Sequence, residues 1–472
     1  MPNNIQIAVV GSGYVGLVAA VCFAEMGHDV ICVDNDERKV AALQGGDTLI
    51  HENYLPELLQ RYRNTKVRFM TDLAEATREC EAIFIAVGTP QSETGDADLS
   101  YVEAVACEIA RSITSYKVIV EKSTVPVYTN EWIRRAIERN GVARDLFDVV
   151  SNPEFLREGT AVADFLHPDR IVVGADSERA AAVLNGIYEP LTGGSYYLRP
   201  DAIPGSCSAT AKPPLLNTST KSAEIIKHAS NAFLAVKISF INAVSNLCEA
   251  TDANVEQVAI GMGMDARIGP KFLRPGIGYG GSCFPKDSSS LLHTANRVGY
   301  DFPLMAATIQ TNEEQPKRFI ARIDSVLGGF AGKKIAVLGL AFKANTDDMR
   351  DAKSLDVIQA ILAGGGTVTA YDPIAMENTK RIFPQIGYAK NAFEAADGVD
   401  AVVVVTEWNE FKQINLEKLK STMAGTHVFD GRNLYDPAKM SRLGFDYYGV
   451  GRGCSAHAVV RPGTVRETVS IK

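Results

Sequence analysis

The stretch that decides the fold of this chain is IQIAVVGSGYVGLVAAVCFAEMGHDVICVD, residues 5–34. Its apolar start predicts a buried strand, and GSGYVG predicts a tight turn. The small residues that follow predict a helix closed by Gly27, and DVICVD predicts a second strand. A strand, a helix and a strand in this order form the first unit of an α/β domain with a parallel sheet.

Three glycines occupy the predicted turn, Gly11, Gly13 and Gly16, with the spacing G-x-G-x-x-G. Glycine permits the tight turn, lets a pyrophosphate approach the backbone and lets the helix pack closely on the strand. Asp34 ends the second strand, where a carboxylate binds a ribose 2′-hydroxyl and repels a 2′-phosphate. The stretch therefore predicts a dinucleotide site that prefers NAD to NADP. The alternative is a glycine turn that serves packing only.

Further apolar stretches, typical of strands, lie at 82–90, 116–126 and 147–155, with helical segments between them. Residues 192–219 are rich in Pro, Gly, Ser and Thr, and predict an irregular connection. Residues 221–253 then predict one long helix without Gly or Pro. This helix is apolar on much of its circumference, so we expect it to be buried on several sides, as a spine between domains or subunits.

The strand, turn, helix and strand pattern begins again at residue 333, without the three-glycine spacing. We therefore predict an α/β fold with two Rossmann-like, doubly wound parallel-sheet domains joined by a long central helix. The predicted domains are an NAD-binding domain at 1–215, a helical domain with a dimerisation role at 216–325, and a second Rossmann-like domain at 326–472.

Composition sets the broad class of the protein. A chain of 472 residues, 46% hydrophobic and 22% charged, is typical of two or three globular domains. The net charge of −8 gives no general surface for nucleic acid. The N-terminal sequence has no basic leader, and no apolar run is expected to cross a membrane, so we expect a soluble cytoplasmic protein.

The eight cysteines do not form a disulfide framework over a chain of this length. No two of them have the C-x-x-C spacing, and the seven histidines are scattered, so no metal site is predicted. Cys283 stands apart because it lies in GIGYGGSCFPKD, residues 276–287. A helix is predicted to open near Pro285, and a thiol at a helix N-terminus is stabilised as the reactive thiolate. The alternative is a buried, inert cysteine.

Polar residues of the right chemistry accompany this cysteine. Asp287 follows one helical turn after Cys283, and Lys227 and Asn231 share one face of the long helix. A lysine on a largely buried helix needs a role, although a solvated lysine is the ordinary alternative. His228 points elsewhere and is interpreted as structural.

Two further groups are less specific. Glu154 and Glu158 follow a predicted strand end, where they suit sugar hydroxyls or a water, or are ordinary exposed acids. Lys343, Arg350 and Arg432 occupy strand-end loops of the second α/β domain, where a phosphate clamp and plain surface cations are both open.

Several motifs together resemble the nucleotide-sugar 6-dehydrogenase family, which includes the UDP-glucose/GDP-mannose dehydrogenases. They run in order through GSGYVGLV, VGTP, KSTVPV, NPEFLREG, KHASNAFLAVKISFIN, GGSCFPKD, LGLAFKANTDDMRDA, DGRN and YYGVGR, and cover nearly the whole chain. The connection at 196–219 is longer than is typical of the family, and the tail after Arg452 has no clear counterpart.

The resemblance implies a four-electron oxidation of a sugar alcohol to an acid with NAD, with UDP-glucose as substrate and UDP-glucuronate as product. It implies that Cys283 carries a thiohemiacetal and then a thioester. Lys227 and Asn231 would stabilise the oxyanion, Asp287 would manage protons, and Thr124 and Glu154 would order the water.

The resemblance also implies the binding residues. Those for the cofactor are Gly11, Gly13, Val15, Gly16, Asp34, Arg38, Thr89, Thr124, Glu158, Lys286 and Arg350. Those for the substrate are Glu154, Phe155, Leu156, Lys227, Asn231, Phe272, Arg274, Gly280, Phe342, Lys343 and Arg432, with Arg267 reaching across a homodimer interface.

Three alternatives stay open at this point. The same chemistry on GDP-mannose or UDP-N-acetylmannosamine is the nearest one. A two-electron hydroxyacid dehydrogenase would have no use for Cys283 or for a second nucleotide domain. A sensor that binds nucleotide sugars without turnover would not need Cys283, Lys227, Asn231 and Asp287 together.

Overall fold

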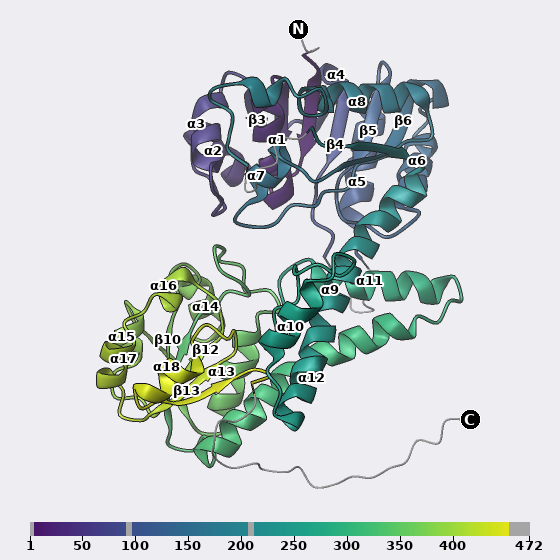
Figure 1. Cartoon of the computed structure of the whole chain (residues 1–472). Helices are drawn as coiled ribbons and strands as arrows, with labels where there is room; N and C mark the ends of the chain where they lie inside the picture. The colour runs from purple at the N-terminus through teal and green to yellow at the C-terminus, as the bar shows by residue number, and fades with distance from the viewer. Residues whose placement is uncertain (1–3, 91–96, 206–211, 453–472) are drawn as a thin grey trace, which may run out of the picture. The chain divides into compact units, whose positions relative to one another are not determined.

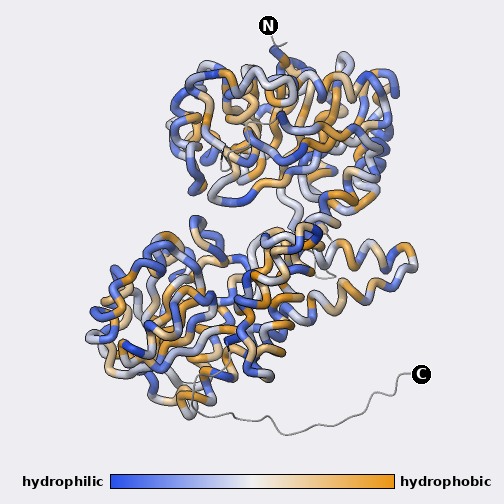
Figure 2. Tube along the Cα trace, in the orientation of Figure 1, coloured by the Kyte–Doolittle hydropathy of each residue, from blue (hydrophilic) through white to orange (hydrophobic). Residues whose placement is uncertain are grey.

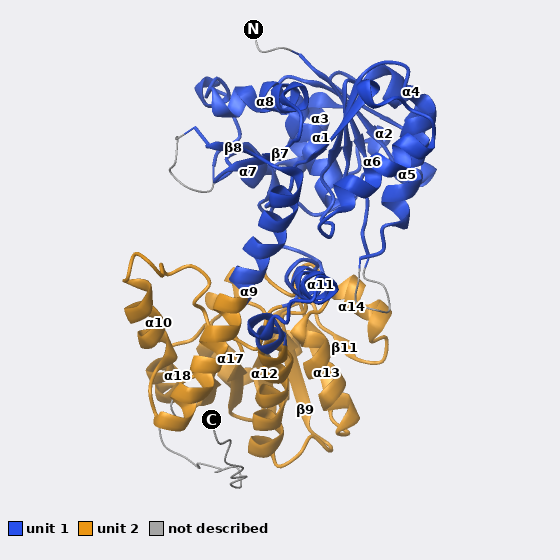
Figure 3. Ribbon diagram, turned by 90° about the vertical axis from the view of Figure 1, so that its right-hand side faces the viewer, with its two compact units in different colours: residues 1–235, 280–309, 345–350 blue, residues 236–279, 310–344, 351–472 orange. Residues whose placement is uncertain are grey.

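The computed structural model describes residues 4–90, 97–205 and 212–452 (Figure 1). The chain divides into two compact units, each built from several segments (Figure 3). Unit 1 comprises residues 1–235, 280–309 and 345–350, and unit 2 comprises residues 236–279, 310–344 and 351–472. The predicted domain boundaries stay a prediction, because the units group segments that are separated along the chain.

Unit 1 is built around an eight-stranded sheet with the strand order β3-β2-β1-β4-β5-β6-β7-β8. The strands are β1 (Gln6–Val10), β2 (Asp29–Val33), β3 (Val67–Met70), β4 (Ala82–Ile85), β5 (Lys117–Glu121), β6 (Phe147–Ser151), β7 (Ile171–Gly174) and β8 (Leu215–Thr218). The helices of its first 200 residues are α1 (Tyr14–Glu25), α2 (Glu37–Gly45), α3 (Leu55–Tyr62), α4 (Leu73–Glu79), α5 (Ser100–Ser112), α6 (Thr129–Arg139), α7 (Ala161–Leu166) and α8 (Glu178–Thr192), with short 3₁₀ turns at Arg144–Leu146 and Tyr196–Leu198.

Both faces of this sheet are covered, which is why its central strands β1 and β4 are almost continuously apolar. Ile7 and Val9 of β1 pack into one cluster with α1, and Ala8 and Val10 pack into a second cluster on the opposite face. The apolar strands run through the centre of the unit in Figure 2. The predicted doubly wound sheet is confirmed.

Two details of unit 1 differ from the sequence prediction. The pairing of β6 with β7 is antiparallel, through Ser151 and Gly174, whereas all the other pairings in the sheet are parallel. The connection at 192–219 was predicted to be irregular, but its end forms the edge strand β8, which pairs with β7. Four residues of mixed polarity on a sheet edge carry too weak a pattern to be separated from a loop.

Unit 2 repeats the architecture with a six-stranded parallel sheet of order β11-β10-β9-β12-β13-β14. Its strands are β9 (Lys334–Leu338), β10 (Thr367–Tyr371), β11 (Gly387–Tyr388), β12 (Ala401–Val404), β13 (His427–Asp430) and β14 (Asp446–Gly449). Its helices after β9 are α13 (Lys353–Ala363), α14 (Met376–Ile382), α15 (Ala392–Ala395), α16 (Asn409–Lys412), α17 (Leu416–Thr422) and α18 (Pro437–Arg442).

Four helices lie between the two sheets along the chain: α9 (Thr220–Thr251), α10 (Val255–Gly263), α11 (Phe284–Arg297) and α12 (Pro303–Leu327). The long helix α9 confirms the predicted central helix, and it begins in unit 1 and ends in unit 2. One face of α9 is exposed in this single chain, because Phe233, Phe240 and Leu247 are 64%, 52% and 62% exposed, while Lys227, Ala235 and Ile241 are buried.

Within the described residues, α9 is also long and apolar enough to cross a membrane by length and composition. The expectation that no run passes this test is therefore wrong. Its most apolar window is 44% buried inside the protein, and the core helix of a soluble protein passes the same test.

The nucleotide turn generates a test of the fold. A Cβ on Gly16 would lie 1.9 Å from the carbonyl oxygen of Gly11, whereas a Cβ on Gly13 would meet nothing within 4 Å. We expect Gly16→Ala to destabilise unit 1 by about 2 kcal/mol, because the backbone must move to relieve the clash. The midpoint of thermal unfolding, measured without cofactor, should fall by several degrees. Gly13→Ala is the matched control and should fall much less. Equal midpoints for the two variants would contradict this reading of the turn.

Candidate active site

The glycine turn leaves bare backbone at the start of a helix. Gly11 follows β1 with φ of 103°, and a Cβ there would lie 2.6 Å from the carbonyl oxygen of Ala86. Gly13 is the N-cap of α1, a helix of 12 residues. The fold itself therefore requires Gly11 and Gly16, while Gly13 leaves space beside the backbone N–H groups of the helix. This arrangement fits a pyrophosphate at a helix N-terminus.

Asp34 lies directly after β2 and is tied to the same turn. Its Oδ2 accepts hydrogen bonds from the backbone N–H and the hydroxyl of Ser12, at 2.8 and 2.6 Å. Burial alone would raise the pKa of Asp34, but the bonds from Ser12 and from the Asp36 N–H outweigh it and lower that pKa. The carboxylate is thus ionised and held in place beside the glycines, which suits a ribose hydroxyl of NAD.

The aspartate at the corresponding position of unit 2 is fully hydrogen-bonded within its own unit. Asp372 follows β10, and its Oδ2 accepts hydrogen bonds from the N–H groups of Leu340 and Ala341 and from the indole of Trp408. Its Oδ1 accepts two more backbone bonds, and the residue is fully buried. The second sheet thus keeps the strand-end aspartate but uses it entirely for its own folding.

Cys283 is the N-cap of α11, which confirms the helix predicted near Pro285. Burial nevertheless raises the pKa of the Cys283 thiol above 9.0, although Lys227 acts in the opposite direction. The predicted stabilisation of the thiolate by the helix N-terminus is therefore outweighed by burial. The desolvation of the sulfur is the larger effect, so the thiol stays protonated until another group removes its proton.

Lys227 and Glu154 form a buried ion pair in unit 1. The Nζ of Lys227 lies 2.7 Å from the Oε1 of Glu154, and each side chain is only 5% exposed. Burial alone would lower the pKa of Lys227, but Glu154, Cys283 and Asp287 together raise it. Burial alone would raise the pKa of Glu154, and Lys227 brings it below the usual range. Both groups are therefore charged, and the cation is fixed near the sulfur.

Asn231 and Asp287 meet beside this pair. The Nδ2 of Asn231 donates a 2.6 Å hydrogen bond to the Oδ2 of Asp287, and Asp287 is fully buried. Asn231 lies one turn after Lys227 on α9, and Asp287 lies one turn after Cys283 on α11. The structure thus brings together the four residues that the sequence predicted to work together.

A chain of hydrogen bonds leads from α11 to the ends of two strands. The Nζ of Lys286 lies 3.0 Å from the hydroxyl of Thr89, which donates to the backbone carbonyl of Thr124 at 2.8 Å. Glu158 accepts from the hydroxyls of Ser282 and Thr346, each at 3.2 Å, and lies 3.4 Å from Arg350. These predicted cofactor residues therefore lie in one unit, and most of them are linked.

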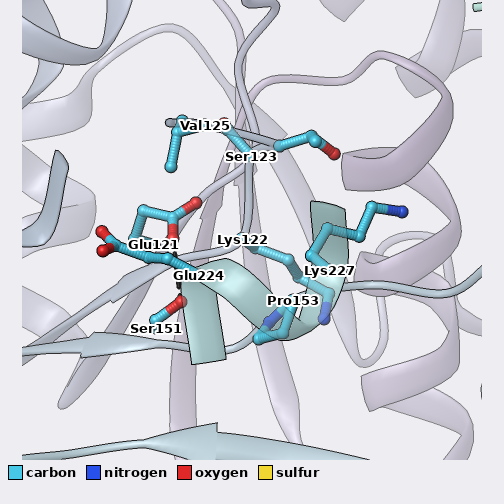
Figure 4. A pocket seen from close by; sticks show the side chains of 9 residues that line it. Glu121, Lys122, Ser123, Val125, Ser151, Pro153, Glu224 and Lys227 are labelled. Carbon is cyan, nitrogen blue, oxygen red and sulfur yellow. Dashed lines mark hydrogen bonds between the residues drawn. The ribbon is translucent and has the colours of Figure 1, made fainter. Parts of the chain in front are cut away.

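A small cavity lies beside Lys227, and the space in it that the centre of a water molecule can occupy is about 10 Å³. It is lined by Glu121, Lys122, Ser123, Thr124, Val125, Ser151, Pro153, Glu224 and Lys227. In Figure 4 the two glutamates lie on one side and the two lysines on the other. Burial raises the pKa of Glu224 to about 7 and lowers that of Lys122 to about 8. Glu224 and Lys122, whose pKa values lie near neutral pH, were not singled out from the sequence, because only their burial distinguishes them from surface residues.

The remaining predicted residues of unit 1 are less constrained. The N–H of Leu156 donates to Glu154 at 2.6 Å, and Phe155 lies 5.7 Å from the Nζ of Lys227 and 3.5 Å from the guanidinium of Arg170. Gly280 is buried and Val15 is half-buried. The side chain of Arg38 is 93% exposed and contacts Asp36 at 3.4 Å.

The predicted nucleotide residues of unit 2 form a separate group. The guanidinium of Arg432 donates to the carbonyl groups of Val405 and Phe342, at 2.7 and 3.0 Å. The Nζ of Lys343 lies 5.4 Å from the ring of Phe342. A Cβ on Gly276 would lie 3.4 Å from the Nη1 of Arg432, so the glycine loop 276–279 passes close to it.

Three further residues predicted to bind substrate precede the glycine loop in the chain. Phe272 has a positive φ of 64°, and Arg274 is exposed. The side chain of Arg267 is 89% exposed and pairs with Asp265 at 2.6 Å. Elsewhere, the six described cysteines are unpaired, and no group of three metal ligands occurs among the described residues.

Comparison with known proteins identifies the family of this chain. Residues 5–192 match the NAD binding domain of the UDP-glucose/GDP-mannose dehydrogenase family, residues 221–314 its central domain, and residues 336–437 its UDP binding domain. A UDP-glucose 6-dehydrogenase of Rhizobium meliloti is 45% identical over 453 residues, which are 95% of this chain and 100% of the relative. The UDP-glucose 6-dehydrogenase TuaD of Bacillus subtilis is 43% identical over 449 residues, 95% of this chain and 93% of the relative.

Among solved structures, a UDP-glucose dehydrogenase from the archaeon Pyrobaculum islandicum superposes with a TM-score of 0.85 at 36% identity. The match covers 96% of this chain and 99% of that one. The two-sheet fold joined by a long helix is thus shared with a dehydrogenase of this family.

The raised pKa of Cys283 gives a chemical test of the site. The rate at which iodoacetamide alkylates Cys283 should still be rising above pH 9, because only the thiolate reacts. Lys227→Met removes the cation that opposes this shift, so its alkylation profile should move to higher pH. Mass spectrometry of the peptide that contains Cys283 measures the rate separately from the other cysteines. Lys221→Met, at an exposed position of the same helix, is the matched control. An alkylation profile of Lys227→Met that matches the control would show that Lys227 does not act on the thiol.

Proposed function

This chain belongs to the UDP-glucose/GDP-mannose dehydrogenase family, and we propose that it oxidises UDP-glucose to UDP-glucuronate. Family membership makes it an NAD-dependent oxidoreductase. The observation that carries the specific proposal is the group in unit 1 in which the half-buried Cys283 lies near Lys227, Glu154 and Asp287. Asn231 joins this group through its hydrogen bond to Asp287. A simple alcohol dehydrogenase does not require such a thiol, whereas oxidation through to an acid does.

NAD supplies the hydride acceptor of both oxidations when it is bound. The residues proposed to hold it are Gly11, Gly13, Val15, Gly16, Asp34, Arg38, Thr89, Thr124, Glu158, Lys286 and Arg350. Gly11 and Gly16, which the fold requires, and the ionised Asp34 support this assignment. Lys286 donates a hydrogen bond to Thr89, another of the proposed cofactor residues. Burial lowers the pKa of Lys286, so its charge is sensitive to an anion placed beside it.

The thiol of Cys283 is proposed to add to the C6 aldehyde and form a thiohemiacetal. Lys227, held by Glu154, would stabilise the oxygen anion that develops there, together with Asn231. After the second oxidation the same sulfur carries a thioester. Glu154 and Thr124 are proposed to order the water that releases the acid, while Asp287 accepts protons.

The nucleotide part of the substrate is assigned to residues of unit 2. Phe342, Lys343 and Arg432 are proposed to bind it, with Phe272, Arg274 and, from a second subunit, Arg267. The fixed position of the Arg432 guanidinium supports a role in holding a phosphate or a base. Phe155, Leu156 and Gly280 of unit 1 are proposed to contact the sugar.

Substrate identity is tested by counting NADH per sugar. With limiting UDP-glucose, we expect about two NADH per sugar, because oxidation of an alcohol to an acid removes four electrons. GDP-mannose and UDP-N-acetylmannosamine are supplied separately as the competing substrates. Cys283→Ser should bind both ligands but release no acid. One NADH per sugar would refute acid formation, and turnover with only another sugar would refute UDP-glucose as substrate.

We also propose that the protein is a homodimer that associates through α9 and α10. Phe240 and Leu247 lie seven residues apart, and so on the same face of α9, and both are more than half exposed. Ile260 and Met264, in and just after α10, are 59% and 79% exposed. Large apolar side chains in one region of a chain are typical of an interface between subunits.

A second copy is the occupant we propose for this surface, and it would also bring Arg267 to its partner. Phe240→Glu should lower the mass measured by light scattering from that of a dimer to that of a monomer at micromolar concentration. Ile382→Glu, at an exposed apolar position on α14, is the matched control and should leave the mass unchanged. A monomeric wild-type protein, or a dimer unaffected by Phe240→Glu, would contradict the proposal.

The remaining assignments follow from composition and from the domain matches. We propose that the enzyme acts in the cytoplasm, without a membrane or nucleic-acid partner, which the net charge of −8 and the unpaired described cysteines support. We also propose the division at 1–215, 216–325 and 326–472, which the three matched domains support.

A further inference from the structure

His228 is a buried titratable residue that the proposed mechanism does not use. It follows Lys227 on α9 and is 2% exposed. Its Nε2 lies 2.6 Å from the backbone carbonyl oxygen of Val125. A carbonyl oxygen can only accept, so Nε2 carries a hydrogen and donates it. In the neutral ring, Nδ1 therefore has a lone pair and no hydrogen.

The other side of the ring faces Asp287. The Nδ1 of His228 lies 3.9 Å from the Oδ1 of Asp287, and both side chains are nearly inaccessible. Neither of these two atoms has a hydrogen-bond partner among the described residues. The second carboxylate oxygen, Oδ2, is already used by Asn231. Two buried acceptors thus face each other, and each of them lacks a donor.

A second buried histidine of the same unit shows what a purely structural arrangement looks like. His28 is 1% exposed, and its Nε2 lies 2.9 Å from the carbonyl oxygen of Ile187. Its Nδ1 accepts a hydrogen bond from the N–H of Ile5, at 3.3 Å. Both ring nitrogens of His28 are therefore satisfied without a change of protonation. His228 has the same bond at Nε2 but an acidic group in place of the donor.

One proton resolves the conflict at His228. Leaving buried polar atoms without a partner is costly, and a proton shared by Nδ1 and Oδ1 would satisfy both atoms at once. The gap must close by about 1 Å to reach hydrogen-bond length. The charged groups that act on the ring are Asp287 of α11, which favours a proton there, and Lys227 and Lys286, which oppose it. Burial lowers the pKa of His228, so the ring is neutral before a proton reaches the pair.

We propose that His228 is a positioning residue that forms a proton-holding pair with Asp287. This role rests on the proposed function. When the substrate hydroxyl gives its proton to Asp287, the carbon that bears this hydroxyl gives its hydride to NAD. The proton then passes from the Oδ1 of Asp287 to the Nδ1 of His228, which gives an imidazolium beside a carboxylate. Asp287 is thereby a free base again, and the proton returns to solvent through Asp287 when product leaves.

The Nε2 bond gives this pair its geometry. Val125 directly follows Thr124, so the carbonyl that orients His228 belongs to the same loop as a residue proposed to order water. Because Nε2 stays bonded to that carbonyl, the ring cannot turn its hydrogen toward Asp287. Only Nδ1 is available for the proton.

The first test does not require turnover. Wild-type protein is labelled with ¹³Cε1-histidine, and the signal of His228 is identified by its loss in His228→Gln. We expect this signal to titrate with pH, and Asp287→Asn to lower its midpoint by about one pH unit, because a nearby carboxylate raises the pKa of a histidine. The midpoint of His28 should not move. A His228 signal that does not titrate in the pH range over which the protein stays folded, or a midpoint unchanged in Asp287→Asn, would overturn the proposal.

The second test is the pH profile of kcat. His228→Gln keeps a donor for the Val125 carbonyl but has no group that titrates. We expect its kcat to fall roughly tenfold, with KM for the nucleotide sugar unchanged, as for loss of one proton-transfer partner. Its acid limb should move to lower pH, because the variant has no imidazole at position 228 to take up a proton. His28→Gln is the matched control and should keep the wild-type limb.

The outcomes separate this proposal from the proposed function. An acid limb in His228→Gln that matches the wild-type limb would make His228 structural and overturn the pairing. Absence of turnover with all nucleotide sugars would refute the proposed function, and the ¹³C titration would still decide whether the pair exists.

Discussion

The buried ion pair of Lys227 and Glu154 is the interaction on which the rest of unit 1 depends. Removing two charges from water costs several kcal/mol per ion, and the cost is offset only when the two stay together with good geometry. The pair therefore fixes α9 against the segment that follows β6. Cys283 and Asp287 are placed around this cation, and the charge of Lys227 acts directly on the sulfur. The loss of either partner would leave an uncompensated charge beside the nucleophile.

The two sheets share a strand, turn, helix and strand pattern but use the aspartate at the end of the second strand differently. In unit 1 the strand-end Asp34 is held by Ser12 and the Asp36 N–H, beside a turn with little side-chain bulk. In unit 2 the equivalent Asp372 accepts five hydrogen bonds from its own unit, and Gly339 lies against Thr406. The strand-end carboxylate is proposed to bind NAD in unit 1, whereas in unit 2 it holds the loop that follows β9. A sequence pattern alone does not distinguish these uses, because it contains the acid but not its partners.

Most of the fold followed from local patterns, since long apolar strands and the spacing of Gly11, Gly13 and Gly16 are strong signals. The edge strand β8 did not, because its pairing with β7 is a long-range property. The grouping of Cys283, Lys227, Asn231 and Asp287 was predicted from helical spacing and from the family resemblance. The pKa of Cys283 could not be predicted in this way, because it depends on how far the sulfur is buried. His228 was interpreted as structural for the same reason: its spacing says nothing of the carboxylate opposite.

The protonated state of Cys283 has a consequence for the lifetime of the enzyme. Peroxide oxidises thiolates and leaves thiols largely intact, and higher oxidation states of cysteine are not readily reversed. A cysteine that stays a thiol between turnovers, and becomes a thiolate only when a base beside it acts, is exposed to this damage for a small part of its time. The burial that makes Cys283 a weaker acid thus protects the sulfur that we propose as the nucleophile.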